Sequence, residues 1–157
     1  LGKIADGVFH VKKPKNPGYQ VEVESQLISD KSKATEVVEK IDIGAIMALG
    51  DAESGKKIFK KCAACHSINK DGKNKIGPAL YNVVGRTVGG LEDYKYSKTL
   101  ASYGKEWTFK ELNGFLQKPA SYLKGTKMSY AGLRKEKDRA SIIKYLNQSS
   151  DNPKLLP

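Results

Sequence analysis

The sequence predicts an all-α domain with four to five helices and almost no sheet. Apolar residues recur at helical spacing in 51–65 and again in 135–148, and residues 108–111 form a helix-capping box. Only residues 19–24 alternate between polar and apolar in the manner of a strand. With 157 residues and 39% hydrophobic content, the chain suffices for one domain with a core.

The first 50 residues predict little regular structure. Residues 1–35 are expected to be irregular, because 12–18 contains two prolines and a glycine, which break helices. The alternation in 19–24 predicts one short strand. The small apolar patch at 41–49 predicts either a short helix packed on the domain or a strip on its surface, and it is too short to span a membrane.

The compact domain is expected to begin at Asp51, which can cap a helix whose first turn contains Glu53. This helix is predicted to run to about Cys65, and Gly55 allows another helix to approach it closely. Its apolar face carries Ile58, Phe59 and Cys62.

The rest of the chain predicts loops and then helices. Residues 67–95 are rich in Gly, Asn, Asp and Lys and predict loops. A short helix is expected over 97–103, and the capping box starts another at Thr108, which must stop near Gln117. The last helix is predicted over 135–148, with apolar residues at the spacing of a core face.

Charge divides the chain into two parts. Residues 1–50 contain seven Lys and seven acidic residues, whereas 51–157 contain 21 Lys or Arg against 10 Asp or Glu, so the net charge of +11 lies in the second part. Such a domain could face nucleic acid, anionic lipid or an acidic protein patch, and the plainer alternative is a solvated surface. No nucleic-acid-binding motif accompanies the charge, and no stretch approaches the ~20 apolar residues of a membrane span.

Residues 62–66, Cys-Ala-Ala-Cys-His, have the C-x-x-C-H pattern of a c-type haem attachment site. The thiols of Cys62 and Cys65 can each add to one haem vinyl group, and His66 then reaches the iron as an axial ligand. Because the chain has no other cysteine, one haem and no disulfide are expected. The alternatives are a redox pair, a chance match, or a zinc half-site, for which His10 is the only other histidine.

A haem that carries electrons needs a second axial ligand, and the chain has two methionines. Met47 lies in the apolar patch, whereas Met128 lies in a polar loop between Gly125 and Gly132. Because the glycines give this loop freedom to approach a cofactor, the position favours Met128.

Taken in order, these motifs make residues 51–148 resemble a class I cytochrome c, the mitochondrial-type group found also in α-proteobacteria. The matching segments are 55–59, 62–66, Gly77-Pro78-Ala79-Leu80, Gly85-Arg86, Tyr94-Lys95-Tyr96-Ser97, Trp107-Thr108, Gly125-Thr126-Lys127-Met128, Asp138-Arg139-Ala140 and Tyr145-Leu146. The resemblance implies the cytochrome c fold around one covalently bound haem c. It also implies that His66 and Met128 are the axial ligands and that the carbonyl of Pro78 accepts the second imidazole N–H.

The resemblance implies further roles around the haem. Tyr96 and Trp107 match the residues that hydrogen-bond to a buried haem propionate, and Arg86 matches the arginine beside it, which offsets the cost of burying a carboxylate. The crossing of the first and last helices matches Gly55, Phe59 and Tyr145. Two positions depart from the family. Phe115 stands where many members have a tyrosine that donates a hydrogen bond near the sulfur, and Lys124 stands where many have proline.

The resemblance implies a monomeric one-electron carrier, not an enzyme, between a quinol-oxidising cytochrome bc complex and a terminal cytochrome c oxidase. Acidic faces of these partners are expected to meet lysines around the haem edge. The candidates are Lys61, Lys70, Lys73, Lys75, Lys118, Lys124 and Lys127. The rival interpretations are a haem enzyme or gas-handling protein with an open sixth site, and a haem domain cut from a larger redox enzyme or sensor.

The expected organisation is an N-terminal extension at 1–50, a haem domain at 51–150 and a tail at 151–157. The chain opens without an initiator Met or a signal-like segment, although C-x-x-C-H haem attachment usually takes place outside the cytoplasm. Residues 12–24 resemble the stretch that links a membrane anchor to the haem domain in anchored bacterial relatives. We therefore expect a cytochrome tethered on the periplasmic side of the bacterial inner membrane, with its anchor absent from this chain.

Overall fold

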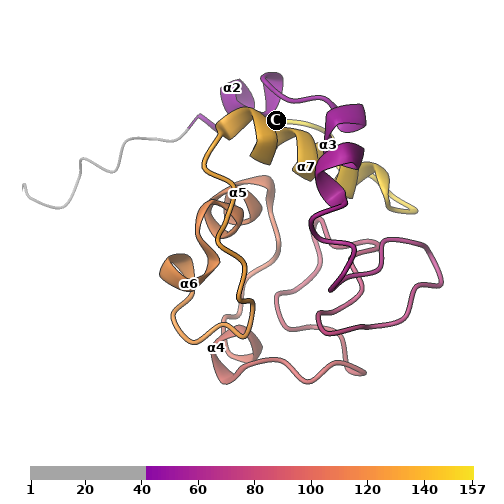
Figure 1. Cartoon of the computed structure of the whole chain (residues 1–157), viewed down its shortest axis with the longest axis vertical. Helices are drawn as coiled ribbons and strands as arrows, with labels where there is room; N and C mark the ends of the chain where they lie inside the picture. Colours follow the sequence, from indigo (N-terminus) through magenta and orange to yellow (C-terminus); the bar gives the residue numbers. More distant parts are fainter. Residues whose placement is uncertain (1–41) are drawn as a thin grey trace, which may run out of the picture. The chain divides into compact units, whose positions relative to one another are not determined.

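The computed structural model describes residues 42–157 (Figure 1). The strand predicted at 19–24, the linker-like segment at 12–24 and His10 therefore lie outside the described residues. The helices are α2 (Ile43–Ala48), α3 (Ala52–Phe59), α4 (Lys98–Ala101), α5 (Phe109–Gln117), α6 (Pro119–Tyr122) and α7 (Glu136–Gln148). Within 42–157 the only β pairing is an isolated bridge between Thr87 and Glu106, which confirms the all-α prediction.

The predicted helix starts are confirmed by their caps. The Asp51 side chain accepts a hydrogen bond from the backbone N–H of Ser54 at 2.7 Å, and Thr108 accepts one from the N–H of Glu111 at 3.1 Å. These caps satisfy donors that have no partner inside the helix. Pro119 ends α5 and begins the short helix α6, because its ring suits the first turn of a helix.

The crossing of α3 over α7 forms the centre of the fold, and Figure 1 shows the two helices side by side. Gly55 is buried there, and a side chain at this position would overlap the carbonyl of Ser141. Beside it the rings of Phe59 and Tyr145 lie 5.6 Å apart. The crossing implied by the resemblance is thus confirmed, and it leaves the apolar face of α7 directed at the interior, where Ile142 is 1% exposed.

Within the apolar patch predicted at 41–49, residues Ile43–Ala48 form the short helix α2, which packs on α7. Met47 is 1% exposed, and the ammonium group of Lys144 donates to the carbonyl of Gly50 at 2.9 Å. The packed unit therefore includes residues before Asp51. Among residues 42–157, no helix has the length and apolar character needed to cross a membrane.

One helix is shorter than predicted. The helix expected to reach Cys65 ends at Phe59, and tight turns follow it. In these turns the N–H of Cys62 donates to the carbonyl of Phe59 at 2.8 Å, and the N–H of Cys65 donates to the carbonyl of Cys62 at 3.0 Å. These three-residue hydrogen bonds alternate with four-residue ones, such as that from the N–H of Ala63 to the carbonyl of Phe59 at 2.9 Å, so the backbone departs from a regular α-helix. Cys62, Cys65 and His66 line the cavity described next.

Candidate haem site

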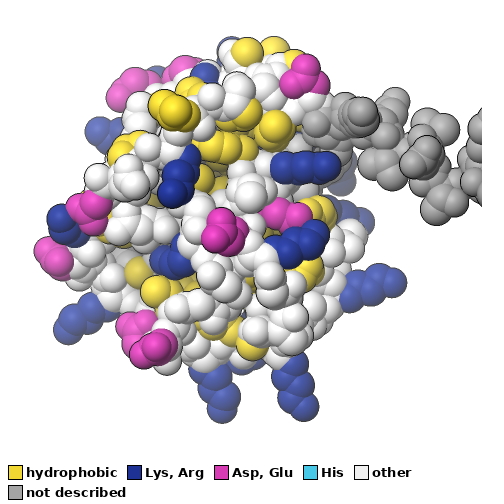
Figure 2. Space-filling view, turned by 180° about the vertical axis from the view of Figure 1, so that it is seen from behind, with side chains coloured by type: hydrophobic (Ala, Val, Ile, Leu, Met, Phe, Trp, Pro, Cys, Tyr) yellow, Lys and Arg dark blue, Asp and Glu magenta, His cyan; other side chains and the backbone are white. Residues whose placement is uncertain are grey.

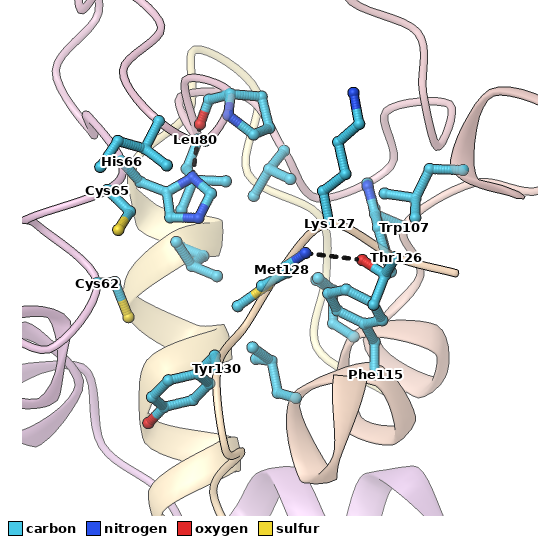
Figure 3. A pocket seen from close by; sticks show the side chains of 18 of the residues that line it. Cys62, Cys65, His66, Leu80, Trp107, Phe115, Thr126, Lys127, Met128 and Tyr130 are labelled. Carbon is cyan, nitrogen blue, oxygen red and sulfur yellow. Dashed lines mark hydrogen bonds between the residues drawn. The ribbon is translucent and has the colours of Figure 1, made fainter. Parts of the chain in front are cut away.

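A cavity lies between α5, α7, the loop after α3 and the loop that joins α6 to α7. Its volume of about 250 Å³ far exceeds the water-sized voids of a packed core, and its walls are mainly apolar. All eight cofactor-binding residues predicted from the sequence line this cavity: Cys62, Cys65, His66, Pro78, Arg86, Tyr96, Trp107 and Met128. Figure 3 labels ten of the lining residues, among them His66, Met128 and both cysteines.

The two cysteines stand on the same side of the cavity as His66 (Figure 3). Neither forms a disulfide, and both are half-buried. Burial raises the pKa of the Cys62 thiol, with Lys61 acting in the opposite direction. The tight turns after α3 therefore place two thiols, three residues apart, at the edge of an apolar cavity.

The imidazole of His66 is fixed from two sides. Its Nδ1 lies 2.7 Å from the carbonyl oxygen of Pro78, twelve residues along the chain. Gly77 lies so close to the ring that a side chain at this position would overlap it. Burial lowers the pKa of His66, opposed by the Pro78 hydrogen bond and supported by the charges of Arg86 and Lys75. The ring is therefore neutral at pH 7, and the lone pair of Nε2 is available to a metal.

Met128 enters the cavity from the loop between α6 and α7, and its side chain points into the interior (Figure 3). Its backbone N–H donates to Thr126 Oγ1 at 3.2 Å. Gly125 and Gly132 take left-handed φ angles of 88° and 99°, which bend the loop at both ends. Met47 is buried in the core and does not line the cavity, so the structure separates the two methionines as the sequence position predicted.

Arg86 fits a buried carboxylate. Its guanidinium donates to the carbonyl of Ala79 at 2.9 Å and to that of Tyr81 at 3.2 Å. Within 42–157, its Nε is the only buried side-chain N or O atom without a hydrogen-bond partner. A buried donor without a partner is costly, so the Arg86 Nε–H could donate to a carboxylate of a bound haem. The resemblance likewise implies that Arg86 lies beside a haem propionate.

Trp107 and Phe115 form an aromatic wall of the cavity, with ring centroids 4.9 Å apart. Both rings are buried, with exposed fractions of 7% and 5%. Tyr96 lines the same cavity, and burial raises the pKa of its hydroxyl. Phe115, the departure from the family, thus lies in the cavity wall, whereas Lys124 is exposed and its carbonyl accepts a hydrogen bond from Thr99 at 2.9 Å.

The seven predicted docking lysines are all exposed, but they differ in position. Lys61 and Lys127 line the cavity, and the ammonium group of Lys75 donates to the carbonyl of Ala63 at 2.7 Å, inside the haem-attachment motif. Lys70 instead pairs with Asp151. The remaining three, Lys73, Lys118 and Lys124, do not line the cavity. Figure 2 shows one face on which basic and acidic side chains intermingle without forming one continuous basic patch.

Sequence reasoning missed part of the cavity and its support. The apolar lining also includes Ile76, Leu80, Val83, Leu100, Leu112, Leu116, Ile142 and Leu146. Helical spacing placed some of these residues in the core without showing that they face a cofactor. The contacts of Asp151 with Tyr81 and Asn82, at 3.1 Å each, were also missed, because these residues lie about 70 positions apart and no local pattern links them.

Comparison with known proteins agrees with this geometry. The Cytochrome c family model matches residues 52–150. A cytochrome c homolog of Rickettsia bellii is 43% identical over 147 residues, covering 93% of this chain and 83% of its own. A cytochrome c homolog of Bradyrhizobium diazoefficiens is 36% identical, covering 98% and 84%. Cytochrome c of Gibberella zeae is 46% identical, covering 66% and 99%.

Among solved structures, cytochrome cH from Methylobacterium extorquens is similar, with a TM-score of 0.59 and 38% identity. The match covers 63% of this chain and 99% of that one. A match of this extent to the family model, together with relatives above 30% identity over most of the chain, shows the family. The chain belongs to the cytochrome c family of electron-transfer proteins and carries a covalently attached haem c, for which Cys62 and Cys65 are the candidate attachment residues.

Proposed function

We propose that this protein carries single electrons in a respiratory chain, from a quinol-oxidising cytochrome bc complex to a terminal cytochrome c oxidase, with His66 and Met128 as the axial ligands. The observation that supports this most strongly is that one apolar cavity brings together a tethered neutral imidazole, a loop methionine and both attachment cysteines. The haem supplies an iron that changes between two oxidation states, and His/Met ligation raises its reduction potential.

Residues of the chain itself orient the His66 ring and exclude water from the cavity. Pro78 holds the His66 ring in one orientation and one tautomer, and the apolar wall of Trp107 and Phe115 excludes water. An apolar surrounding disfavours the extra positive charge of the oxidised state, which also raises the potential. If His66 and Met128 both bind the iron, it would have no free position for a substrate, and the protein would carry electrons and not act as a haem enzyme.

The docking surface proposed for the partners is the rim of the cavity. Lys61 and Lys127 line the cavity and are exposed, and Lys75 lies beside the attachment motif. Positive charges at this rim steer an acidic partner and make association fast and salt-sensitive. Lys70 is the weakest of the candidates because Asp151 already pairs with it.

Steady-state turnover with a cytochrome c oxidase tests this surface. Lys61→Ala and Lys127→Ala should each weaken turnover at low salt and reduce its salt dependence. Lys110→Ala serves as the matched control, since Lys110 is exposed on α5 and does not line the cavity. Equal effects of all three substitutions would contradict a docking surface at the rim.

We further propose that the native protein works as a tethered monomer on the periplasmic side of the inner membrane. Support comes from the linker-like sequence at 12–24 and from bacterial relatives that match 93% and 98% of the chain, well beyond the haem domain. Cell fractionation of the native gene product tests this: a membrane-bound haem protein released by proteolysis before residue 42 supports tethering, and a freely soluble one contradicts it.

A further inference from the structure

The C-terminal tail contacts the loop that carries the cavity arginine. The Asp151 carboxylate accepts hydrogen bonds from the Tyr81 hydroxyl and from the Asn82 side chain, both at 3.1 Å, and it pairs with Lys70. In return, the side-chain oxygen of Asn82 accepts from the backbone N–H of Asp151 at 2.9 Å and from Ser150 Oγ at 2.7 Å. These reciprocal bonds join segments about 70 residues apart.

Asn82 also has an unusual backbone. Its φ of 57° is the only positive φ of a non-glycine residue within 42–157, a conformation that costs free energy and that asparagine tolerates better than most residues. The N–H of Asn82 donates to the carbonyl of Ser149 at 3.0 Å. Residues 149–151, which follow α7 and lead into the tail, therefore contribute main-chain and side-chain partners that hold this turn.

The same turn supplies the partners of Arg86. The guanidinium donates to the carbonyls of Ala79 and Tyr81, and Tyr81 is one of the two loop residues that Asp151 holds through their side chains. The geometry points to Asp151 and Asn82 as positioning residues: they fix the 79–82 turn, and this turn orients Arg86 toward the haem carboxylate. The inference rests on the role proposed for Arg86, and Asp151 lies just beyond the family match at 52–150.

The sign of the shift in midpoint potential distinguishes a loss of Arg86 positioning from the plain loss of the Asp151 charge. A cation held near the haem disfavours the oxidised state, so a loosened Arg86 lowers the midpoint potential. Removing the negative charge of Asp151 by itself has the opposite sign and is weak, because the carboxylate is exposed and screened. Asp151→Ala should therefore lower the midpoint potential of the holoprotein if the tail positions Arg86, and raise it slightly if only charge matters.

Two further variants separate these effects. Asp71→Ala removes a carboxylate that is exposed, as that of Asp151 is, but forms no ion pair or side-chain hydrogen bond within 42–157. This variant should not lower the midpoint potential. Asn82→Gly changes no charge and suits the left-handed φ, yet it deletes the side-chain bonds to the tail. We expect it to lower the potential as Asp151→Ala does.

Hydrogen exchange provides a readout that is independent of the haem potential. The N–H of Gly85 donates to the carbonyl of Trp107 at 2.9 Å, and that of Arg86 donates to Val83 at 3.1 Å. Because the Asp151 carboxylate is exposed, loss of its hydrogen bonds should speed exchange of these amides only as much as loss of a neutral bond would, roughly five- to tenfold, in Asp151→Ala, with no change in Asp71→Ala.

Each variant has a result that would overturn the positioning role of the tail. These results are a raised or unchanged midpoint potential in Asp151→Ala, an unchanged potential in Asn82→Gly, or unchanged amide exchange in Asp151→Ala and Asn82→Gly. Arg86→Lys tests the underlying assumption, because it should lower the potential by removing the forked donor. If Arg86→Lys leaves the potential unchanged, the role of Arg86 fails and the inference fails with it.

Discussion

The wall of the cavity that carries His66 and the wall that carries Met128 are held in different ways. On the first, the ring is bonded directly to the Pro78 carbonyl and packed against the Gly77 backbone. On the second, the hydrogen bond is made by the backbone and not by the ligand side chain: the N–H of Met128 donates to the Thr126 hydroxyl at 3.2 Å, and Gly125 and Gly132 bend the loop at its two ends.

This difference shows which side of the site can move more easily. The His66 ring cannot rotate without breaking a 2.7 Å hydrogen bond and moving backbone. Met128 and Phe115 line the same cavity, and phenylalanine has no hydroxyl to donate to a sulfur. We therefore expect the Met128 side to control ligand exchange and to tune the potential, while the His66 side controls stability.

The largest effect is expected from Met128→Ala, which removes one proposed ligand without disturbing the His66 side. Changes of axial ligand span about 0.8 V among haem proteins, so the midpoint potential should fall by a few tenths of a volt. Cyanide should bind rapidly to the oxidised protein. A redox titration that leaves the potential within the wild-type range would show that Met128 is not a ligand.

Gly77→Ala tests the rigidity of the opposite wall. The added methyl group overlaps the His66 ring, and overpacking of this kind destabilises proteins by about 1–3 kcal/mol. Denaturant unfolding of the holoprotein measures the loss. Wild-type stability in this variant would mean that the His66 ring moves freely and that the contrast between the walls is wrong.

Thr126→Val removes the side-chain hydroxyl that accepts a hydrogen bond from the backbone N–H of Met128. Loss of about 1 kcal/mol from the closed loop should speed cyanide binding roughly fivefold, with little change in unfolding free energy. Ser129→Ala is the control in the same loop, since Ser129 is exposed and forms no side-chain hydrogen bond within the described chain. Equal rates in the two variants would contradict the contribution assigned to Thr126.

Phe115→Tyr should shift the midpoint potential, because the new hydroxyl can donate a hydrogen bond near the Met128 sulfur. A donor withdraws electron density from the thioether, which favours reduced iron, so the expected shift is upward. The Phe115 ring is buried beside Trp107, so a melting curve should accompany the titration. An unchanged potential in a folded variant would rule out this hydrogen bond.

The smallest effect concerns the scaffold behind the methionine loop, where Glu111 accepts hydrogen bonds from the hydroxyls of Tyr103 and Tyr122, both at 2.7 Å. Burial raises the pKa of Glu111, but bonds from Tyr122, Tyr103 and Lys105 outweigh it and hold the pKa below 4.5. Since the folded pKa is the lower one, this stabilisation is complete above the unfolded pKa and is lost as pH falls through the folded value.

Tyr122→Phe should accordingly destabilise the protein by about 1 kcal/mol at neutral pH. Unfolding followed over a range of pH should show the wild type and the variant converging below pH 4.5. A constant gap down to acid pH would mean that the Tyr122 hydroxyl stabilises the protein independently of the charge on Glu111.

The sequence predicted the helical class, the capped helix starts and eight of the residues that line the cavity. These features depend on local patterns, such as the Thr108 capping box and the 62–66 motif, or on family motifs such as Trp107. It did not predict that the helix after Asp51 stops at Phe59, because helical periodicity continues beyond that residue.

Hydrogen bonds between residues far apart in the chain could not be predicted from the sequence either. The Asn82–Asp151 contacts and the Glu111–Tyr122 pair join surface groups whose types are common everywhere on proteins. The packing of α2 on α7 was one of two alternatives for the apolar patch, since a short run of apolar residues fits a buried helix and a surface strip equally well. Only the fold distinguishes them.

The optical spectrum of the oxidised protein tests the central claim most directly. If Met128 completes the iron coordination opposite His66, a weak near-infrared band from sulfur-to-iron charge transfer should be present, and added cyanide should bind slowly or not at all at neutral pH. A missing band together with rapid cyanide binding would show an open sixth site and would contradict the electron-carrier account in favour of an enzyme or a sensor.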